Sequence, residues 1–101
     1  MLSRIQAAFR AGQYETGPHA LIRQLGWGIG EGDIIEAVGN DAPEIIEDYP
    51  GDPRGHSCLI RGEARRRVLH IVCTIDEPIF LITCYEPDPR LWDPGFRSRR
   101  K

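Results

Sequence analysis

The side chains of this sequence that suit proton transfer and phosphate binding are three histidines, three tyrosines and twelve arginines. His70 lies in one apolar run, residues 68–75, and Tyr85 ends the next, residues 79–85. Because side chains alternate along a strand, both turn away from their core neighbours, and Arg61 of the preceding run joins them. With His70 as general acid or base and Arg61 as charge stabiliser, these residues predict an open sheet-face site for a polyanion.

An alternative interpretation makes His70 and Tyr85 structural, packed beneath the C-terminal part of the chain. A second candidate catalytic pair is His19 and Arg23, because a spacing of four residues places both on one face of a helix. These two side chains either reach a substrate or pair with an acid such as Asp48. Both alternatives stay open at the level of the sequence.

Charge is segregated along the chain, although the formal net charge is only −2. Residues 31–53 contain eight acids and no lysine or arginine, whereas residues 54–67 contain five arginines and one glutamate. A dipolar molecule of this kind can bind phosphate at its basic end, and a solvated surface is the alternative. The predicted RNA-binding residues belong to a basic turn and a basic tail: Arg65, Arg66, Arg67, Arg97, Arg99, Arg100 and Lys101.

The sequence contains no recognisable motif for a metal, a cofactor or a catalytic nucleophile. Its histidines and cysteines lack the spacing of a zinc site. The glycine repeat in residues 26–32 stands between two expected helices rather than after a strand, so it does not match a nucleotide-binding fingerprint. Three irregularly spaced cysteines indicate a reducing compartment. We therefore expect no cofactor, no metal and a cytoplasmic location.

The elements that position these residues are expected to be helices first and strands after. Capping and stop residues predict three short helices within residues 3–39, at 3–12, 17–26 and 31–39. Apolar runs bounded by turns predict four strands within residues 44–85, at 44–49, 57–62, 68–75 and 79–85. Residues 86–101 are expected to fold back over the sheet, with Trp92 and Phe96 as anchors.

Helices gathered before a meander of short-linked strands indicate the α+β class. We expect two or three helices packed on a four-stranded antiparallel sheet, in a single domain of residues 1–101. The face toward the helices is predicted to carry Leu69, Ile71, Cys73, Ile75, Phe80, Ile82 and Cys84. No apolar run is long enough to span a membrane, and the first residues are not those of a signal peptide.

Several short segments occur in a consistent order over residues 5–96. They are His19-Ala20-Leu21-x-Arg23, Gly28-Ile29, Ile46-Glu47-Asp48-Tyr49-Pro50, Ser57-Cys58-Leu59-Ile60, Leu69-His70-Ile71-Val72 and Tyr85-Glu86-Pro87-Asp88. Together they resemble a bacterial family, domain of unknown function 4258. That family is similar to small ribonuclease toxins of the RelE and BrnT types, and its members are often encoded beside a small zinc-finger or DNA-binding antitoxin.

This resemblance implies a RelE-like fold whose open sheet face handles messenger RNA. It also implies an antitoxin protein, mRNA or the ribosome as partners, and no membrane. The positions that match the family's polar pattern are His19, Arg23, Asp48, Tyr49, His70, Tyr85 and Glu86.

The expected function is therefore that of a toxin in a bacterial toxin–antitoxin pair, a metal-independent endoribonuclease acting on mRNA. In this chemistry a base activates the 2′-hydroxyl, and Arg61 or Arg23 stabilises the phosphorane. The alternative is a non-catalytic protein-binding module that uses the exposed sheet face or the acidic helix. An enzyme acting on a small molecule is a third interpretation, for which the sequence shows no pocket signature.

Overall fold

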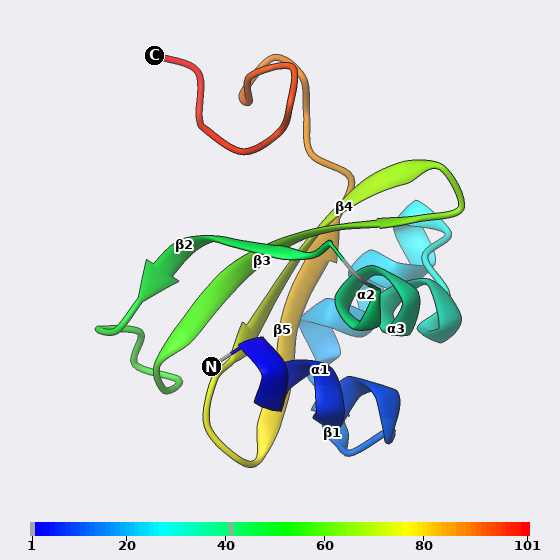
Figure 1. The fold of residues 1–101 in the computed structure, drawn as a ribbon, viewed down its shortest axis with the longest axis vertical. Helices are drawn as coiled ribbons and strands as arrows, with labels where there is room; N and C mark the ends of the chain where they lie inside the picture. The colour runs from blue at the N-terminus through cyan, green and yellow to red at the C-terminus, as the bar shows by residue number, and fades with distance from the viewer. Residues whose placement is uncertain (1, 41) are drawn as a thin grey trace.

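The computed structural model describes residues 2–40 and 42–101, so Asp41 of the acidic run lies outside the described residues. Three helices and five strands occur in this part of the chain (Figure 1). In chain order they are α1 (Leu2–Arg10), β1 (Tyr14–Thr16), α2 (Pro18–Trp27), α3 (Glu31–Gly39), β2 (Glu44–Tyr49), β3 (Ser57–Ala64), β4 (Arg67–Thr74) and β5 (Ile79–Tyr85). The structure therefore belongs to the predicted α+β class.

The five strands form one mixed sheet in the order β1-β5-β4-β3-β2. The four expected strands, β2 to β5, are present and pair with one another in antiparallel fashion. The additional strand β1 runs parallel to β5 and pairs Tyr14 with Ile79 and Thr16 with Leu81. A run of three residues is too short to show strand periodicity, which is why the sequence did not predict it.

The sheet separates the helices from the C-terminal segment, residues 86–101, which Figure 1 shows in orange to red on the opposite side. Ile5 and Phe9 of α1 and Ile34 of α3 are fully buried against the helix side of the sheet. On the other side, Trp92 is 2% exposed and packs with Leu59, Val72 and Ile82, with Phe96 partly buried beside them. The prediction that this segment folds back on Trp92 and Phe96 is confirmed.

A β-bulge in β5 changes which of its residues face the helices. Ile71 pairs with Cys84 and Val72 with Thr83, but Cys73 pairs with Leu81, so Ile82 is an extra residue. The bulge reverses the alternation before it and turns Ile79 and Leu81 toward the helices. Assigning Phe80 and Ile82 to that face was wrong, since both pack in the cluster under the C-terminal segment. The assignment of Leu69, Ile71 and Cys73 was correct.

Helix α3 lies unusually close to β3. A Cβ atom built on Gly62 would lie 2.2 Å from the carbonyl oxygen of Ala37, so only glycine permits this approach. The close contact fixes the first turn of α3 above the β3–β4 turn, which matters for the ion pairs described below.

No helix in residues 2–40 or 42–101 is both long and apolar enough to cross a membrane.

Candidate functional site: a pocket between α2 and the C-terminal segment

Helix α2 is held against the part of β5 that β1 leaves uncovered. The N–H of Gly17, just before α2, donates to the carbonyl of Leu81 at 3.0 Å. A Cβ at Gly17 would lie 2.6 Å from the ring of Phe80, so a glycine is needed for this approach. The helix then begins with Pro18, where proline is tolerated, and ends at Gly28, whose φ of 64° suits a C-cap glycine.

A pocket of about 340 Å³ opens between α2, the end of β5 and the C-terminal segment. It is lined by His19, Arg23, Trp27, Thr83, Tyr85, Glu86, Asp88, Leu91, Trp92 and Arg99. Three of the five predicted catalytic residues, namely His19, Arg23 and Tyr85, therefore share one pocket, together with Glu86 of the family pattern. This pocket lies at an edge of the sheet rather than on an open sheet face.

The pocket contains one unpaired cation. Within the described part of the chain, the basic side chains that form no hydrogen bond or ion pair are those of Arg23, Arg66 and Lys101. Arg23 is the only one of these three that lines the pocket. The expectation that Arg23 pairs with an acid such as Asp48 is therefore wrong, and its guanidinium is available to a phosphate.

Two other pocket groups have defined electrostatic roles. Burial raises the pKa of Tyr85 above its ordinary value, so the phenol stays protonated and can donate a hydrogen bond. Arg99 forms two hydrogen bonds to Glu47, at 2.8 and 3.0 Å, and lies 4.6 Å above the ring of Trp92. Its hydrogen bond lowers the pKa of Glu47 and keeps that carboxylate ionised. Glu47 and Trp92 thus hold the Arg99 side chain in place in the lining of the pocket.

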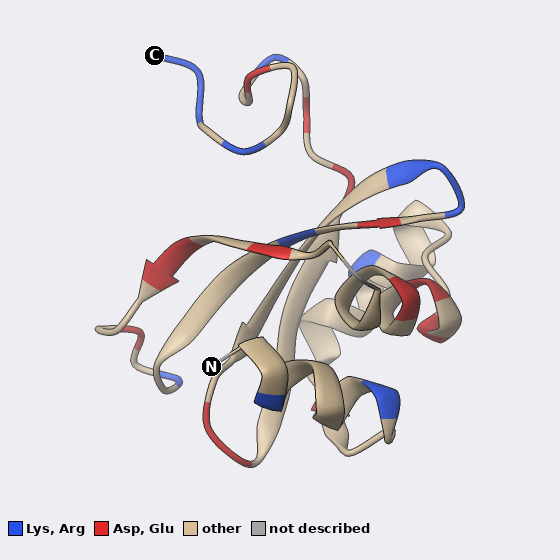
Figure 2. Ribbon diagram, viewed as in Figure 1, with Lys and Arg blue, Asp and Glu red and all other residues tan. Residues whose placement is uncertain are grey.

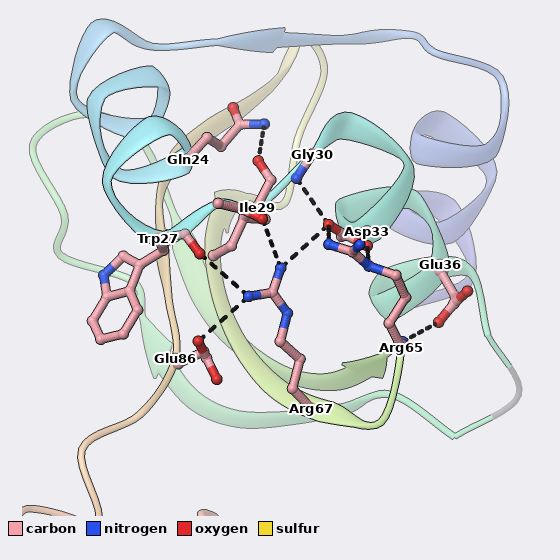
Figure 3. Close-up of polar contacts among 10 residues, drawn as sticks. Gln24, Trp27, Ile29, Gly30, Asp33, Glu36, Arg65, Arg67 and Glu86 are labelled. Carbon is pink, nitrogen blue, oxygen red and sulfur yellow. Dashed lines mark hydrogen bonds and ion pairs between the residues drawn. The ribbon is translucent and has the colours of Figure 1, made fainter.

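Glu86 is positioned by Arg67, which reaches it from the first residue of β4 (Figure 3). The two side chains are 3.4 Å apart. The same guanidinium donates to the carbonyls of Trp27 and Gly28, at 3.3 and 2.9 Å, and contacts Asp33 at 3.3 Å. Arg67 therefore connects the end of α2, the start of α3 and the end of β5, and it holds the Glu86 carboxylate at the pocket.

The remaining predicted catalytic residues, Arg61 and His70, are buried. Arg61 pairs across the sheet with His70, and His70 with Tyr85, so the three do form one row as predicted. However, His70 is 0% and Arg61 7% exposed, because the C-terminal segment covers them. Arg61 donates to the carbonyl of Gly95 at 2.7 Å and His70 Nε2 to that of Phe96 at 2.9 Å. The expectation of an open sheet face here is wrong, and the alternative packing interpretation describes His70.

His70 also has the environment of a neutral imidazole. Its ring meets those of Tyr85 and Trp92 edge to face, with centroids 5.4 and 4.5 Å away. Burial lowers the pKa of His70, and the nearby charge of Arg61 acts in the same direction. Nδ1 of His70 has no hydrogen-bond partner among the described residues. A charged imidazole is therefore disfavoured at this position.

The predicted RNA-binding arginines are mostly bound to carboxylates of the protein itself. In Figure 2 the blue β3–β4 turn lies beside the red residues of α3, and Arg65 contacts Asp33 at 2.6 and 2.7 Å. In the tail, Arg97 binds Glu44 and Arg99 binds Glu47. Of the seven predicted residues, those without a hydrogen bond or ion pair in the described chain are Arg66 and Lys101. A continuous phosphate-binding surface on the turn and tail is not present, since acids neutralise it.

The last two positions of the family pattern, Asp48 and Tyr49, do not line the pocket. Asp48 contacts His56 at 2.5 Å, and the Tyr49 hydroxyl donates to Glu47. A second pocket, of about 280 Å³, is lined by His56 and its neighbours and contains none of the predicted catalytic residues. No group of three or more His, Cys, Asp or Glu side chains could hold a metal ion within residues 2–40 and 42–101.

The analysis of the sequence missed Trp27 and Leu91 as pocket residues. Trp27 is 42% and Leu91 59% exposed, and the two come from opposite walls. The only signal in the sequence was a tryptophan between two glycines at the expected end of a helix. Such a position does not require a large buried side chain, so Trp27 could have been expected at the surface.

Comparison with curated proteins and with solved structures gave no match to this chain. A family model matches residues 16–86, which include the whole of α2, α3 and the four antiparallel strands. The match includes His19, Arg23, Tyr85 and Glu86 of the pocket. The chain belongs to the family described as domain of unknown function DUF4258.

Proposed function

We propose that this protein is a metal-independent endoribonuclease, the toxin of a bacterial toxin–antitoxin pair, and that the pocket between α2 and the C-terminal segment is its active site. The observation that carries the proposal is the unpaired Arg23 beside His19, Tyr85 and Glu86 in one pocket. Cleavage of RNA by its own 2′-hydroxyl requires a base, an acid and a cation, and no cofactor. These four side chains supply all three.

Glu86, which Arg67 positions, takes the proton of the 2′-hydroxyl. The 2′-oxygen then attacks the phosphorus, and Arg23 stabilises the negative charge of the phosphorane. The bond from phosphorus to the 5′-oxygen breaks, and His19 gives that oxygen a proton. Tyr85 donates a hydrogen bond to a non-bridging oxygen. The products are a 2′,3′-cyclic phosphate and a 5′-hydroxyl.

The pocket also offers a surface for a nucleobase. Trp27 and Leu91 present exposed apolar area at its rim, and aromatic side chains bind unpaired bases by stacking. A single-stranded RNA segment is therefore the substrate that fits the mixture of cation, acid–base pair and aromatic side chain.

The test is cleavage of a fluorescent single-stranded RNA by the purified protein in excess EDTA. We expect a 2′,3′-cyclic phosphate product, detected by mass spectrometry, and no cleavage where a 2′-deoxynucleotide replaces the ribonucleotide at the cut. Arg23→Gln and Glu86→Gln should each lower the rate by about 10²–10⁴-fold, the usual contribution of such groups.

The matched control is Arg4→Gln, because Arg4 is an exposed arginine on α1, 3.7 Å from Asp76 and outside the pocket. It should cleave at the wild-type rate. Equal rates for Arg4→Gln and Arg23→Gln, or cleavage that depends on added Mg²⁺, would contradict the proposal.

The toxin role is tested by inducing the chain in a growing bacterium. We expect wild-type protein to stop growth and deplete bulk mRNA, and Glu86→Gln to do neither at the same protein level. The resemblance to RelE- and BrnT-type toxins supports this role.

The second candidate function is that of a protein-binding module without catalysis. It is supported by the burial of Arg61 and His70, which takes two predicted catalytic residues out of reach of a substrate. Because the C-terminal segment covers the second sheet face, such a module would use another surface. Complete absence of RNA cleavage, with a defined protein partner, would favour this function.

A further inference from the structure

Arg61 is a buried cation that the protein neutralises only in part. Its side chain is 8% exposed, and its ion pair is with Glu63, at 3.4 Å, on a side chain that is 58% exposed. Its shortest hydrogen bond goes to a neutral acceptor, the carbonyl of Gly95, at 2.7 Å. Buried charges in proteins are normally paired with an opposite charge at short distance. An anion beside Arg61 would therefore be stabilised more than the carbonyl that lies there.

A loop of the C-terminal segment, residues 93–98, places two carbonyl oxygens on the side chains of the sheet. Nε of Arg61 donates to the carbonyl of Gly95, and Nε2 of His70 donates to that of the next residue, Phe96, at 2.9 Å. A guanidinium and a neutral imidazole N–H are both donors that bind phosphate oxygens. The two carbonyls satisfy these donors, but they carry no charge that could neutralise Arg61.

The 93–98 loop is hydrogen-bonded to itself rather than to the backbone of the strands. The N–H of Asp93 donates to the carbonyl of Ser98, and the N–H of Phe96 donates to the carbonyl of Asp93, both at 2.9 Å. At its base, Trp92 and Arg99 pair with each other as an isolated antiparallel bridge. The loop can therefore retract as a unit, while this bridge and the buried ring of Trp92 stay in place.

The attachment of the loop to the sheet is weak. Arg97 pairs with Glu44 of β2 at 2.9 Å, but both side chains are about half exposed, and exposed ion pairs contribute little to stability. Phe96 has a φ of 58°, in the left-handed region that residues with a side chain rarely adopt. Its ring is partly buried on the sheet, which keeps the loop closed in the free protein. A ligand that binds the sheet more tightly can therefore displace the loop.

We infer that Arg61 and His70 form a phosphate-binding site that the 93–98 loop masks in the free protein. The carbonyls of Gly95 and Phe96 occupy the place of two phosphate oxygens. A phosphate that enters displaces the loop and supplies the negative charge that the carbonyls lack. The loop is thus an autoinhibitory contact, because the apparent affinity for phosphate is reduced by the fraction of molecules in which the site is open.

Tyr85 connects this site to the active-site pocket. It lines the pocket and also pairs across the sheet with His70, with the two ring centroids 5.4 Å apart. An RNA strand whose scissile phosphate lies at Arg23 can therefore place a flanking phosphate at His70 and Arg61. That the phosphate belongs to RNA rests on the proposed function, whereas the masked site itself does not.

Arg97→Glu is the variant that opens the loop, because a glutamate at this position is repelled by Glu44. The probe is a fluorescein-labelled hexamer of 2′-O-methyl RNA, which cannot be cleaved because it has no free 2′-hydroxyl. Fluorescence anisotropy measures its affinity for the full chain. We expect Arg97→Glu to bind the probe about 5-fold more tightly, the change that an exposed ion pair accounts for. Net charge alone predicts weaker binding, since a negative charge replaces a positive one.

The matched control is the double variant Glu44→Arg, Arg97→Glu, which restores both the ion pair, with its signs reversed, and the net charge of the wild type. It should bind the probe as weakly as the wild type. Hydrogen exchange followed by mass spectrometry reports on the loop, and residues 93–98 should exchange faster in Arg97→Glu than in the double variant. Equal exchange in the two variants, or faster exchange without tighter binding, overturns the inference.

Two further variants locate the phosphate. In the Arg97→Glu background, His70→Gln and Arg61→Gln should each remove the gain in affinity. If Arg61→Gln does not fold, as judged by circular dichroism, nuclear magnetic resonance of Arg97→Glu with inorganic phosphate takes its place. Phosphate should shift the Nε–H resonance of Arg61 and raise the pKa of His70, and a titration that changes neither overturns the inference.

The source of the phosphate is decided by comparing the two probes. Binding of inorganic phosphate at Arg61 without tighter binding of the RNA hexamer overturns the assignment to RNA. RNA that binds at Arg61 but is never cleaved, when unmodified RNA is used, contradicts the proposed function alone.

Discussion

Replacing Asp33 by asparagine tests the ion-pair network that holds the β3–β4 turn and, through Arg67, Glu86. The carboxylate is 8% exposed and accepts hydrogen bonds from Gly30 N–H at 2.9 Å, from Arg65 and from Arg67. Asparagine keeps the shape and, through its one oxygen, the bond from Gly30, but Asp33→Asn removes the charge and turns an NH₂ group toward Nε of Arg65. The cost can therefore be worked out from the two arginines.

The Arg65 side chain is 65% exposed, so its pair with Asp33 contributes about 0.2–1 kcal/mol despite the short distances. Arg67 is 22% exposed, and a hydrogen bond to a charged group contributes about 1.5–3 kcal/mol before its 3.3 Å length is discounted. Together these give a loss of about 2 kcal/mol in the free energy of unfolding. For a chain of this length that lowers Tm by about 10 °C.

The pH dependence gives a second check on Asp33. Burial acts to raise its pKa, but the hydrogen bonds from Gly30 and Arg65 and the charge of Arg67 outweigh burial and lower it. The pKa of Asp33 is lower in the folded protein than in the unfolded chain, where it is about 3.9, so the ionised carboxylate stabilises the fold at pH values above about 3.9. This stabilisation is lost as the pH falls through the folded pKa. The advantage of wild type over Asp33→Asn should therefore be present at neutral pH and vanish in strong acid.

Urea unfolding followed by circular dichroism measures both effects. The control is Glu31→Gln, which removes another acid from the first turn of α3, one that accepts a 3.2 Å hydrogen bond from the Tyr14 hydroxyl. We expect it to cost less than about 1 kcal/mol. Asp33 does not stabilise the turn through its charge if Asp33→Asn is as stable as wild type at neutral pH, or if the lower stability of this variant persists in strong acid.

Three further predictions concern the sheet and are measured by the same unfolding assay. Ile71→Ala should cost about 2–5 kcal/mol, since Ile71 is fully buried, and an unchanged Tm would contradict its place in the core. Gly62→Ala should lower the free energy of unfolding by more than Gly51→Ala at a solvent-exposed turn, because a Cβ at position 62 would meet the backbone of Ala37. The pKa of His70 is lower in the folded protein than in the unfolded chain, so the unfolded chain binds a proton at this residue first as the pH falls. The free energy of unfolding should therefore decrease as the pH drops below about 6.5, and the decrease should be smaller in His70→Gln.

Local signals predicted the helices and the main strands correctly. Proline and glycine at the ends of α2 predicted its first and last residues to within one position, and β2 and β5 begin and end at the predicted residues. Period-two alternation also placed Arg61, His70 and Tyr85 in one row. These features depend on backbone preferences and on neighbours within a few residues, which a sequence states directly.

Features that depend on an irregularity were not predictable in this way. One extra residue in β5, Ile82, reversed the alternation and exchanged the faces of Phe80 and Leu81. The three residues of β1 form a strand only by pairing with β5, which is distant in the sequence. A single inserted residue leaves no mark in residues 79–85, because the residues around the bulge, 79–82, are all apolar and suit either face.

The sequence by itself determined the class of fold, the order of its helices and of its four antiparallel strands, and the family to which the chain belongs. Only the tertiary structure decided which charged groups are neutralised. Arg65 meets Asp33 from 32 residues away and Arg97 meets Glu44 from 53, while Arg23 meets no acid. Such pairs form between segments that only the packing of helices and C-terminal segment on the sheet brings together. For the same physical reason, the basic turn is bound to α3, and His19, Arg23 and Tyr85 meet in the pocket beside α2.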